Sequence, residues 1–325
     1  MTKKHTNELM VKINTDQQLI AQAELDTLAK NYIQQSLSAS TRKFYSIDLG
    51  IFAQWCDSLG LIPLPSTPDT VARFLAAQAS LGIKPATLIR RLAAIRMAHE
   101  MQGYATPTQH KGVKAVLKGI KREKGIAQKK KAPATAERIE HMIAYCSDTL
   151  TGLRDKALLL LGFAGAFRRS ELVALKVNDI ERTPEGIKVT IRKSKTDQEG
   201  QGQMIAILNG SRLRVVDALM AWLDAANITE GYLFRPIKKG GKVQLTGLTD
   251  RSVANIVKFY AGKLGLTVDD FSGHSLRSGF ITSGAAAGAD LFKLMEVSRH
   301  KKPETIIGYV RESKLFENHA GEKFL

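Results

Sequence analysis

The chain has 325 residues, and its 48 lysines and arginines outnumber 31 aspartates and glutamates, which gives a formal net charge of +17. This length suggests two domains with sizeable cores, and the charge favours a polyanionic partner over an unspecialised basic enzyme. The two cysteines, Cys56 and Cys146, lack metal-ligand spacing, which argues against a zinc or disulfide scaffold and favours a reducing cytoplasm. The sequence has no nucleotide-binding loop, which argues against nucleotide-driven chemistry. Its longest apolar run has eleven residues, which is too short to span a membrane.

The first half of the chain has helical periodicity throughout. Residues 1–15 are polar and predict a mobile tail, and residues 16–122 predict an all-α domain. Its helices are expected over about 16–37, 38–59, 67–81, from 85 onward, and over 111–122. Residues 123–133 are charged and lack periodicity, which indicates a basic interdomain linker, with a merely solvated loop as the alternative.

The second half, residues 134–325, mixes helices with a short β-region. Helices are expected over about 134–145, 153–167, 168–175, 212–226 and 249–264. Alternating apolar residues at 187–191 and 204–207 predict a β-hairpin with a long loop, and a third strand is possible near 177–181. The predicted fold class is therefore mainly α with a small antiparallel β-sheet, built as an all-α N-terminal domain followed by an α+β domain.

Residues 271–311 hold the densest group of chemically competent side chains. His274 and Arg277 are three residues apart and share one face of a helix. His300 and Tyr309 would point apart on one unbroken helix, but Pro303 favours a new first turn, so His300 should end one helix and Tyr309 should lie on the next. These groups are suited to converge on an anion such as a phosphate.

Two further cations precede this stretch in the chain. Arg168 directly follows the apolar run 157–167, where a charge needs an anionic partner, and Glu171 is placed to pair with it. Lys195 lies in the predicted hairpin loop, from which an ammonium can reach a leaving oxygen. Taken singly, each of these residues has a structural explanation: a salt bridge, a solvated lysine, a satisfied histidine or a core tyrosine.

The order Arg, Lys, His-x-x-Arg, His, Tyr resembles that of the tyrosine recombinases, the phage integrase family. The segments AFRRSELVALKVNDI, IRKSKT and SGHSLRSG resemble its arginine box, its lysine hairpin and its His-x-x-Arg box, and the nine-residue step from His300 to Tyr309 is also the family's. The N-terminal half is similar to the core-binding domain of Cre-like members. Within this pattern Arg169 competes with Arg168, and Lys193 with Lys195.

The resemblance implies catalytic roles for six residues and a supporting role for one. Tyr309 would attack a scissile phosphate and form a 3′-phosphotyrosyl bond, without a cofactor or metal. Arg168, Arg277 and His300 would stabilise the transition state, Lys195 would protonate the leaving oxygen, and His274 would take the tyrosine proton. Glu171 would orient the arginine.

The resemblance also implies that the partner is double-stranded DNA with paired half-sites. Two protomers would bind each site, four would assemble in synapsis, and the protein would act in the cytoplasm, on DNA. The residues expected at the DNA are Thr41, Arg42, Lys43, Thr87, Arg90, Arg91, Lys121, Arg122, Arg235, Lys238, Lys239, Lys242 and Arg251. The tail after Tyr309, with Leu315 and Phe316, is expected to dock on a neighbouring protomer.

The sequence leaves two alternatives to a recombinase open. A type IB topoisomerase-like enzyme uses a similar residue set to relax DNA, and a catalytically silent accessory protein would bind DNA only. The Cre-like first half argues against the former, and the six filled positions argue against the latter. The sequence does not give the target site or the choice among integration, excision, inversion and dimer resolution.

Overall fold

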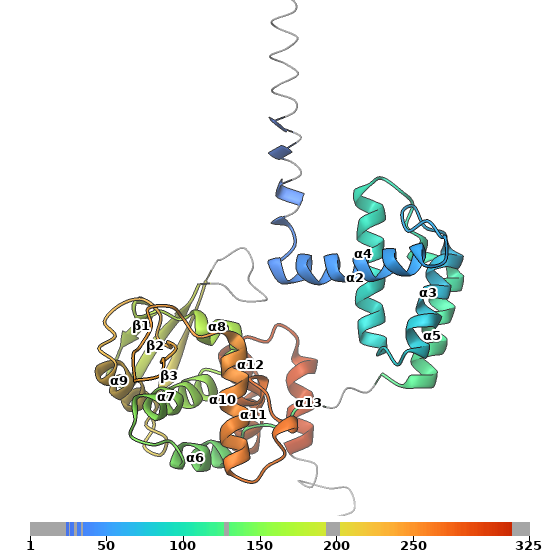
Figure 1. Cartoon of the computed structure of the whole chain (residues 1–325). Helices are drawn as coiled ribbons and strands as arrows, with labels where there is room; N and C mark the ends of the chain where they lie inside the picture. Colours follow the sequence, from blue (N-terminus) through green and yellow to red (C-terminus); the bar gives the residue numbers. More distant parts are fainter. Residues whose placement is uncertain are drawn as a thin grey trace, which may run out of the picture. The chain divides into compact units, whose positions relative to one another are not determined.

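A computed structural model describes residues 24–25, 27–28, 31–33, 35–126, 130–192 and 202–313 of the chain. The predicted mobile tail and the tail with Leu315 and Phe316 lie outside these residues. The chain divides into two compact units, residues 1–128 and 129–325, and the division falls inside the predicted linker. Figure 1 labels the helices and strands of both units.

The first unit is a bundle of helices, which in its fully described part are α2 (Ala39–Asp57), α3 (Pro68–Ser80), α4 (Pro85–Met101), the 3₁₀ turn η1 (Pro107–Gln109) and α5 (Lys111–Lys124). Side-chain caps and prolines set the helix starts. Ser38 Oγ accepts the N–H of Thr41 at the start of α2, and Pro68 and Pro85 occupy the first turns of α3 and α4. The predicted starts of these helices are confirmed.

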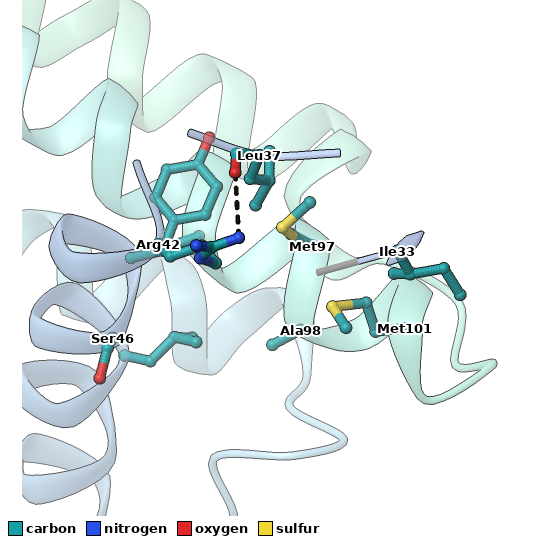
Figure 2. A pocket seen from close by; sticks show the side chains of 10 residues that line it. Ile33, Leu37, Arg42, Ser46, Met97, Ala98 and Met101 are labelled. Atoms are coloured by element: carbon teal, nitrogen blue, oxygen red, sulfur yellow. Dashed lines mark hydrogen bonds between the residues drawn. The ribbon is translucent and has the colours of Figure 1, made fainter. Parts of the chain in front are cut away.

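The core of the first unit is aromatic and aliphatic. Phe52 and Phe74 meet edge-to-face with ring centroids 4.9 Å apart, and Trp55 lies 5.3 Å from Phe74. A mostly apolar hollow lies beside this core, lined by Ile33, Leu37 and residues of α2 and α4 (Figure 2). Arg42 is the charged residue in its lining, and its Nη1 donates to the carbonyl of Leu37 at 3.3 Å.

The second unit packs helices against a three-stranded antiparallel sheet of order β1-β2-β3. Its helices are α6 (Ala136–Ala144), α7 (Leu150–Ala164), α8 (Arg169–Ala174), α9 (Val215–Ala225), α10 (Asp250–Lys263), α11 (His274–Ala286), α12 (Leu291–Ser298) and α13 (Pro303–Ser313), with 3₁₀ turns η2 (Val177–Asp179) and η3 (Val268–Asp270). The strands are β1 (Ile180–Arg182), β2 (Gly186–Ile191) and β3 (Gln203–Leu208), with Val189 paired to Ile180 and Ile205. The predicted fold class, mainly α with a small antiparallel sheet, is confirmed.

Helix α7 forms the centre of this unit, because all residues from 157 to 163 are buried. It ends three residues earlier than the apolar run predicts. Ala166 adopts the left-handed conformation (φ 44°) and turns the chain away before Arg168. The predicted helix 212–226 begins only at Val215, because Arg214 is also left-handed (φ 48°).

The first residues of the second unit run along α11. The N–H of Ala132 donates to the carbonyl of Asp270 at 2.7 Å, and that of Ala134 donates to the carbonyl of Ser275 at 2.8 Å. Gly279 permits this close approach, because a Cβ at that position would collide with the carbonyl of Ala134. Ala132 is therefore held against η3, and Ala134 is held against α11, the helix that carries His274 and Arg277.

No helix in the described part of the chain is long and apolar enough to cross a membrane.

Candidate active site

Arg168 and Glu171 form a pair at the start of α8. The Nη1 of Arg168 donates to Glu171 Oε1 at 2.6 Å, and its backbone N–H donates to Oε2 at 3.0 Å, so the carboxylate also caps the helix. Burial raises the pKa of the Glu171 carboxyl, but the charges of Arg299 and Arg168 outweigh burial and hold the pKa below its ordinary value. Glu171 is therefore an ionised, buried carboxylate.

The neighbouring arginine has a different environment. Arg169 is exposed, and its Nη2 lies 3.5 Å from Asp250 at the start of α10. Of the two adjacent arginines, Arg168 is the one whose charge acts on Arg277. Arg168 therefore lies in the electrostatic neighbourhood of Arg277, whereas Arg169 pairs with Asp250 at the surface.

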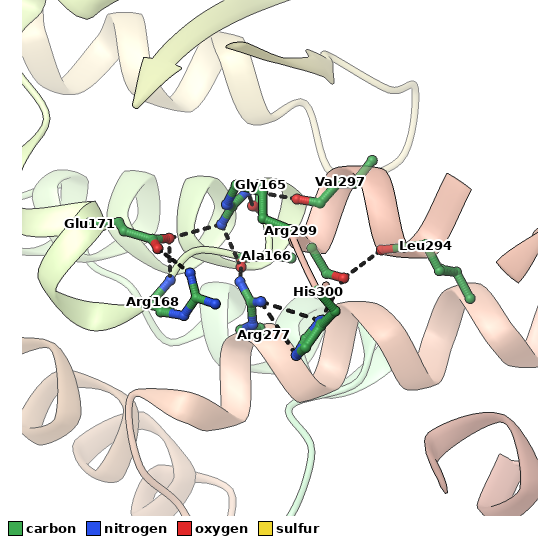
Figure 3. Close-up of polar contacts among 10 residues, drawn as sticks. Gly165, Ala166, Arg168, Glu171, Arg277, Leu294, Val297, Arg299 and His300 are labelled. Atoms are coloured by element: carbon green, nitrogen blue, oxygen red, sulfur yellow. Dashed lines mark hydrogen bonds and ion pairs between the residues drawn. The ribbon is translucent and has the colours of Figure 1, made fainter. Parts of the chain in front are cut away.

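Arg277 is a buried cation at the centre of the site (Figure 3). Its Nη1 donates to the carbonyl of Ala166 at 2.7 Å, and its Nη2 lies 3.2 and 3.4 Å from the two ring nitrogens of His300. Burial, followed by the charges of Arg168 and Arg299, lowers the pKa of Arg277 to about 9. The guanidinium therefore stays protonated at neutral pH, at an electrostatic cost that a bound anion would relieve.

His300 is held in one neutral form by its neighbours. Ser298 Oγ donates its single proton to the carbonyl of Leu294 at 2.5 Å, so at 2.8 Å from His300 Nδ1 it accepts a proton. With Nδ1 carrying the ring hydrogen, Nε2 is the ring nitrogen that can accept from Arg277 Nη2, at 3.4 Å, and the 3.2 Å approach of Nη2 to Nδ1 is a contact without a hydrogen bond. Burial and the nearby cations, Arg277 first, lower the pKa of His300 to about 3, so the ring is neutral at pH 7.

Tyr309 lies on α13, which begins at Pro303 as predicted. Its half-buried ring packs against an apolar cluster that includes Leu294 and Ile306, and the Lys130 ammonium lies 5.7 Å from the ring centroid. Tyr309 is close enough to Arg277 to raise the pKa of that guanidinium against the other influences. The two residues therefore belong to one electrostatic site.

His274 is the first residue of α11 and is exposed, one turn before the buried Arg277. Its charge contributes to lowering the pKa of His300, which places it in the same electrostatic neighbourhood. Lys195 and its competitor Lys193 lie outside the described residues, in the connection between β2 and β3. Strand β3 contacts α12, the helix that ends just before Arg299.

Sequence reasoning missed Arg299. It is 4% exposed, it adopts the left-handed conformation (φ 57°) at the end of α12, and its Nη2 lies 2.9 Å from Glu171 Oε2. In the sequence it opens the run Arg-His-Lys-Lys, which has the pattern of a solvated basic segment and gives no signal of burial.

The residues expected at DNA in the first unit have unequal exposure. Arg90 is partly exposed, lies over the Phe44 ring and donates to both carboxylate oxygens of Asp48, at 2.7 and 3.0 Å. Arg91 was expected to be available outward, and this is wrong: it is 7% exposed and donates to Gln78. The buried carboxylate of Asp48, 3.6 Å from Arg91, explains its inward position. The remaining residues are exposed or half-buried on α2, α4 and α5: Thr41, Arg42, Lys43, Thr87, Lys121 and Arg122.

The second unit divides in the same way. Arg235 was expected on the surface, but it is 7% exposed and donates to the carbonyls of Tyr232 and Glu230, so it braces its own loop. The other candidates are exposed: Arg251 on α10, and Lys238, Lys239 and Lys242 at a turn closed by a bridge between residues 237 and 243. Among the described residues, no cluster of histidine, cysteine, aspartate and glutamate is suited to hold a metal ion.

The sequence model of the phage integrase family matches residues 134–315, more than half of the chain. The chain belongs to this family. The protein is thus a tyrosine recombinase, a DNA strand-transferring enzyme, and the resemblance drawn from its sequence motifs is confirmed.

Named relatives span nearly the whole chain. The integrase/recombinase XerD homolog of Selenomonas ruminantium is 37% identical over 327 residues, covering 97% of this chain and 95% of that protein. Recombinase Cre of Escherichia phage P1 is 24% identical over 313 residues, covering 89% of this chain and 90% of Cre.

Solved structures share the fold at low sequence identity. XerH site-specific recombinase bound to a palindromic difH substrate gives a TM-score of 0.61 at 16% identity, over 84% of this chain and 76% of that one. The Tn1549 transposon integrase in complex with transposon right-end DNA gives 0.62 at 15% identity, over 87% and 92%.

Proposed function

We propose that this tyrosine recombinase cleaves and rejoins duplex DNA at specific sites through a 3′-phosphotyrosyl intermediate on Tyr309 and a Holliday junction. One observation carries the proposal. The buried Arg277 on α11 lies against His300, and its pKa is influenced by the charges of Arg168 and of Tyr309 on α13. A nucleophile is thus paired with a cationic phosphate site.

The charge of the site suits a phosphodiester. Three guanidinium groups, those of Arg168, Arg277 and Arg299, surround the single carboxylate of Glu171, which leaves two positive charges in excess. A phosphodiester carries one negative charge, and more charge develops on its non-bridging oxygens in the transition state. The site therefore stabilises the transition state more than the ground state, which is the requirement for catalysis.

In the proposed step the phenolic oxygen of Tyr309 attacks phosphorus, and the bond from phosphorus to the 5′-oxygen breaks. The tyrosine proton passes to His274, and Lys195 donates a proton to the departing 5′-oxygen. The anionic phosphate raises the pKa of His300, so the ring takes up a proton and donates from Nε2 to a non-bridging oxygen. The phosphotyrosyl bond keeps the phosphodiester energy, and a 5′-hydroxyl of the partner strand reverses the step without a nucleotide cofactor.

The proposed partner is double-stranded DNA with paired half-sites, bound by one protomer per half-site and joined in a tetramer during synapsis. Both solved structural neighbours described above are DNA complexes. The lysines and arginines proposed to contact phosphates are exposed in both units: Lys43, Arg122, Lys238, Lys239, Lys242 and Arg251.

The test begins with selection of bound duplexes from a pool with a randomised central segment, followed by footprinting of the recovered site. A duplex nicked beside the scissile phosphate then traps the covalent adduct, because the short 5′-hydroxyl fragment diffuses away. Wild type is expected to form an adduct that survives denaturation and maps to Tyr309. The Tyr309→Phe variant is expected to bind the site equally well and to form none.

The same reagents separate the proposed function from its alternatives. A junction intermediate from two intact sites indicates recombination, whereas relaxation of supercoiled DNA without strand exchange would indicate a topoisomerase-like enzyme. A wild-type protein that binds the selected site and forms no adduct would reveal an accessory protein and overturn the proposal.

A further inference from the structure

Arg299 is a buried arginine that the mechanism above does not use directly. It donates through Nη1 to the carbonyls of Gly165 at 2.9 Å and Val297 at 2.6 Å, and through Nη2 to the carbonyl of Ala166 and to Glu171, both at 2.9 Å. Its guanidinium also lies 5.1 Å from the Phe167 ring centroid. A non-glycine residue held in the left-handed conformation with so many contacts is strongly constrained by its surroundings.

Arg299 changes the charge balance around Glu171. Glu171 Oε1 pairs with Arg168 and Oε2 pairs with Arg299, so the carboxylate is shared between two cations. Without Arg299, Glu171 would be neutralised by Arg168 alone, and the charge of Arg168 toward an incoming phosphate would be reduced correspondingly. Both Glu171 and Arg299 are nearly inaccessible to solvent, so their Coulombic interaction is weakly screened.

Arg299 also fixes the positions of the groups around it. The carbonyl of Ala166 accepts from Arg299 Nη2 and from Arg277 Nη1, so one oxygen joins the two guanidinium groups (Figure 3). Arg299 also forms the turn that directs His300 back toward Arg277. One side chain thus ties the turn after α7, the start of α8 and the end of α12 together.

We propose that Arg299 is a positioning residue for strand cleavage, which keeps Arg168 available to the phosphate by neutralising Glu171 and fixes Arg277 and His300 through the Ala166 carbonyl and its own turn. The proposal rests on the proposed function. It goes beyond it by assigning a cleavage role to a residue outside the six catalytic positions.

The test measures adduct formation on the nicked duplex under single-turnover conditions with saturating protein. DNA affinity is measured separately in a Tyr309→Phe background. Loss of a preorganised electrostatic contributor typically costs about 100-fold or more in rate, and Arg299→Met is expected to slow cleavage by about 100-fold. DNA affinity should change by less than about threefold, because Arg299 is buried and Arg168 and Arg277 remain. Arg299→Lys keeps the charge without the planar fork and should fall between Arg299→Met and wild type.

A double substitution distinguishes this role from simple structural support. If Arg299 acts mainly through Glu171, removing the carboxylate removes the need for it. Arg299→Met should therefore cost less than about tenfold when introduced into Glu171→Gln, against about 100-fold in wild type, a non-additivity that marks two coupled residues. If Arg299→Met alone fails to fold, the rate of the double variant relative to Glu171→Gln still tests the coupling, and a loss of about 100-fold there would overturn the proposal.

Arg214→Met is the matched control. Arg214 is also left-handed (φ 48°) and pairs with a carboxylate, Asp217, at 2.5 Å, but its side chain is 69% exposed and lies at the start of α9. It should cleave at the wild-type rate. The proposal is overturned if Arg299→Met cleaves within about threefold of wild type, or if Arg299→Met costs as much in Glu171→Gln as in wild type. Absence of an adduct with wild type would instead overturn the proposed function.

Discussion

Replacing Arg277 by methionine is expected to abolish cleavage while leaving the protein about as stable as wild type, or more stable. Most substitutions of a buried side chain destabilise a protein. Arg277 differs because it is held as a cation beside other cations, and this cost is useful only when a phosphate is bound. Methionine has a similar length and carries no charge, so it tests the charge rather than the volume.

The magnitude follows from the surroundings of Arg277. Lowering its pKa from 12.5 to about 9 corresponds to roughly 5 kcal/mol of unfavourable electrostatics in the free protein. The substitution loses the bonds to the Ala166 carbonyl and to His300, each worth about 1.5–3 kcal/mol for a charged donor. The Ala166 carbonyl stays bonded to Arg299 at 2.9 Å. The expected net change lies between about 1 kcal/mol of destabilisation and 2 kcal/mol of stabilisation.

The assay is equilibrium unfolding in urea, followed by tryptophan fluorescence in a Trp55→Phe background. Trp222 is then the only tryptophan in the sequence, and it is fully buried in the second unit, so its emission reports on that unit. Arg235→Met is the comparison variant. It removes another buried arginine, 7% exposed, that donates to backbone carbonyls away from the site. It should destabilise by about 2–4 kcal/mol, because those carbonyls lose their partners.

A loss of more than about 3 kcal/mol in Arg277→Met, comparable to that of Arg235→Met, would refute the reasoning. It would mean that Arg277 is an ordinary structural arginine whose charge is already satisfied. Wild-type stability combined with unchanged cleavage would refute the catalytic assignment instead.

Three further predictions concern other parts of the molecule. The pKa of His300 is about 3 in the folded protein and 6.5 ordinarily, so between these pH values the unfolded chain binds a proton that the folded protein does not. The free energy of unfolding should therefore fall as pH is lowered from 6.5 toward 3, and this dependence should weaken in His300→Gln. An unchanged slope in that variant would contradict the burial of the neutral ring. Asp48→Asn leaves the buried Arg91 without its carboxylate and should destabilise the first unit by about 3–5 kcal/mol. Unfolding of this unit is measured by Trp55 fluorescence in a Trp222→Phe background. A loss of stability below about 1 kcal/mol would contradict a buried ion pair. Gly279→Ala places a methyl group against the carbonyl of Ala134 and should destabilise the second unit by about 1–3 kcal/mol. It should also speed proteolysis near residues 125–133. An unchanged rate of proteolysis would contradict the close packing of Gly279 against Ala134.

The sequence predicted the elements whose signals are local. Apolar periodicity gave the helices of both halves, alternation gave the β2–β3 hairpin, and Pro303 gave the break between α12 and α13. Boundaries were missed where a single left-handed residue overrides the periodicity. Ala166 ends α7 early and Arg214 delays α9, and neither residue type announces a positive φ in a sequence.

The order and spacing of Arg168, His274, Arg277, His300 and Tyr309 were sufficient to identify the family, because chemistry constrains which residue types must be present. Which guanidinium groups are buried, and against which anion, was decided only by the tertiary structure. The burial of Arg91 and Arg235 and the contact of Arg299 with Glu171, 128 residues away in the chain, depend on the packing of distant segments. Charge is a property of a residue and can be read along the sequence, whereas desolvation and pairing are properties of its surroundings and appear only when the chain has folded.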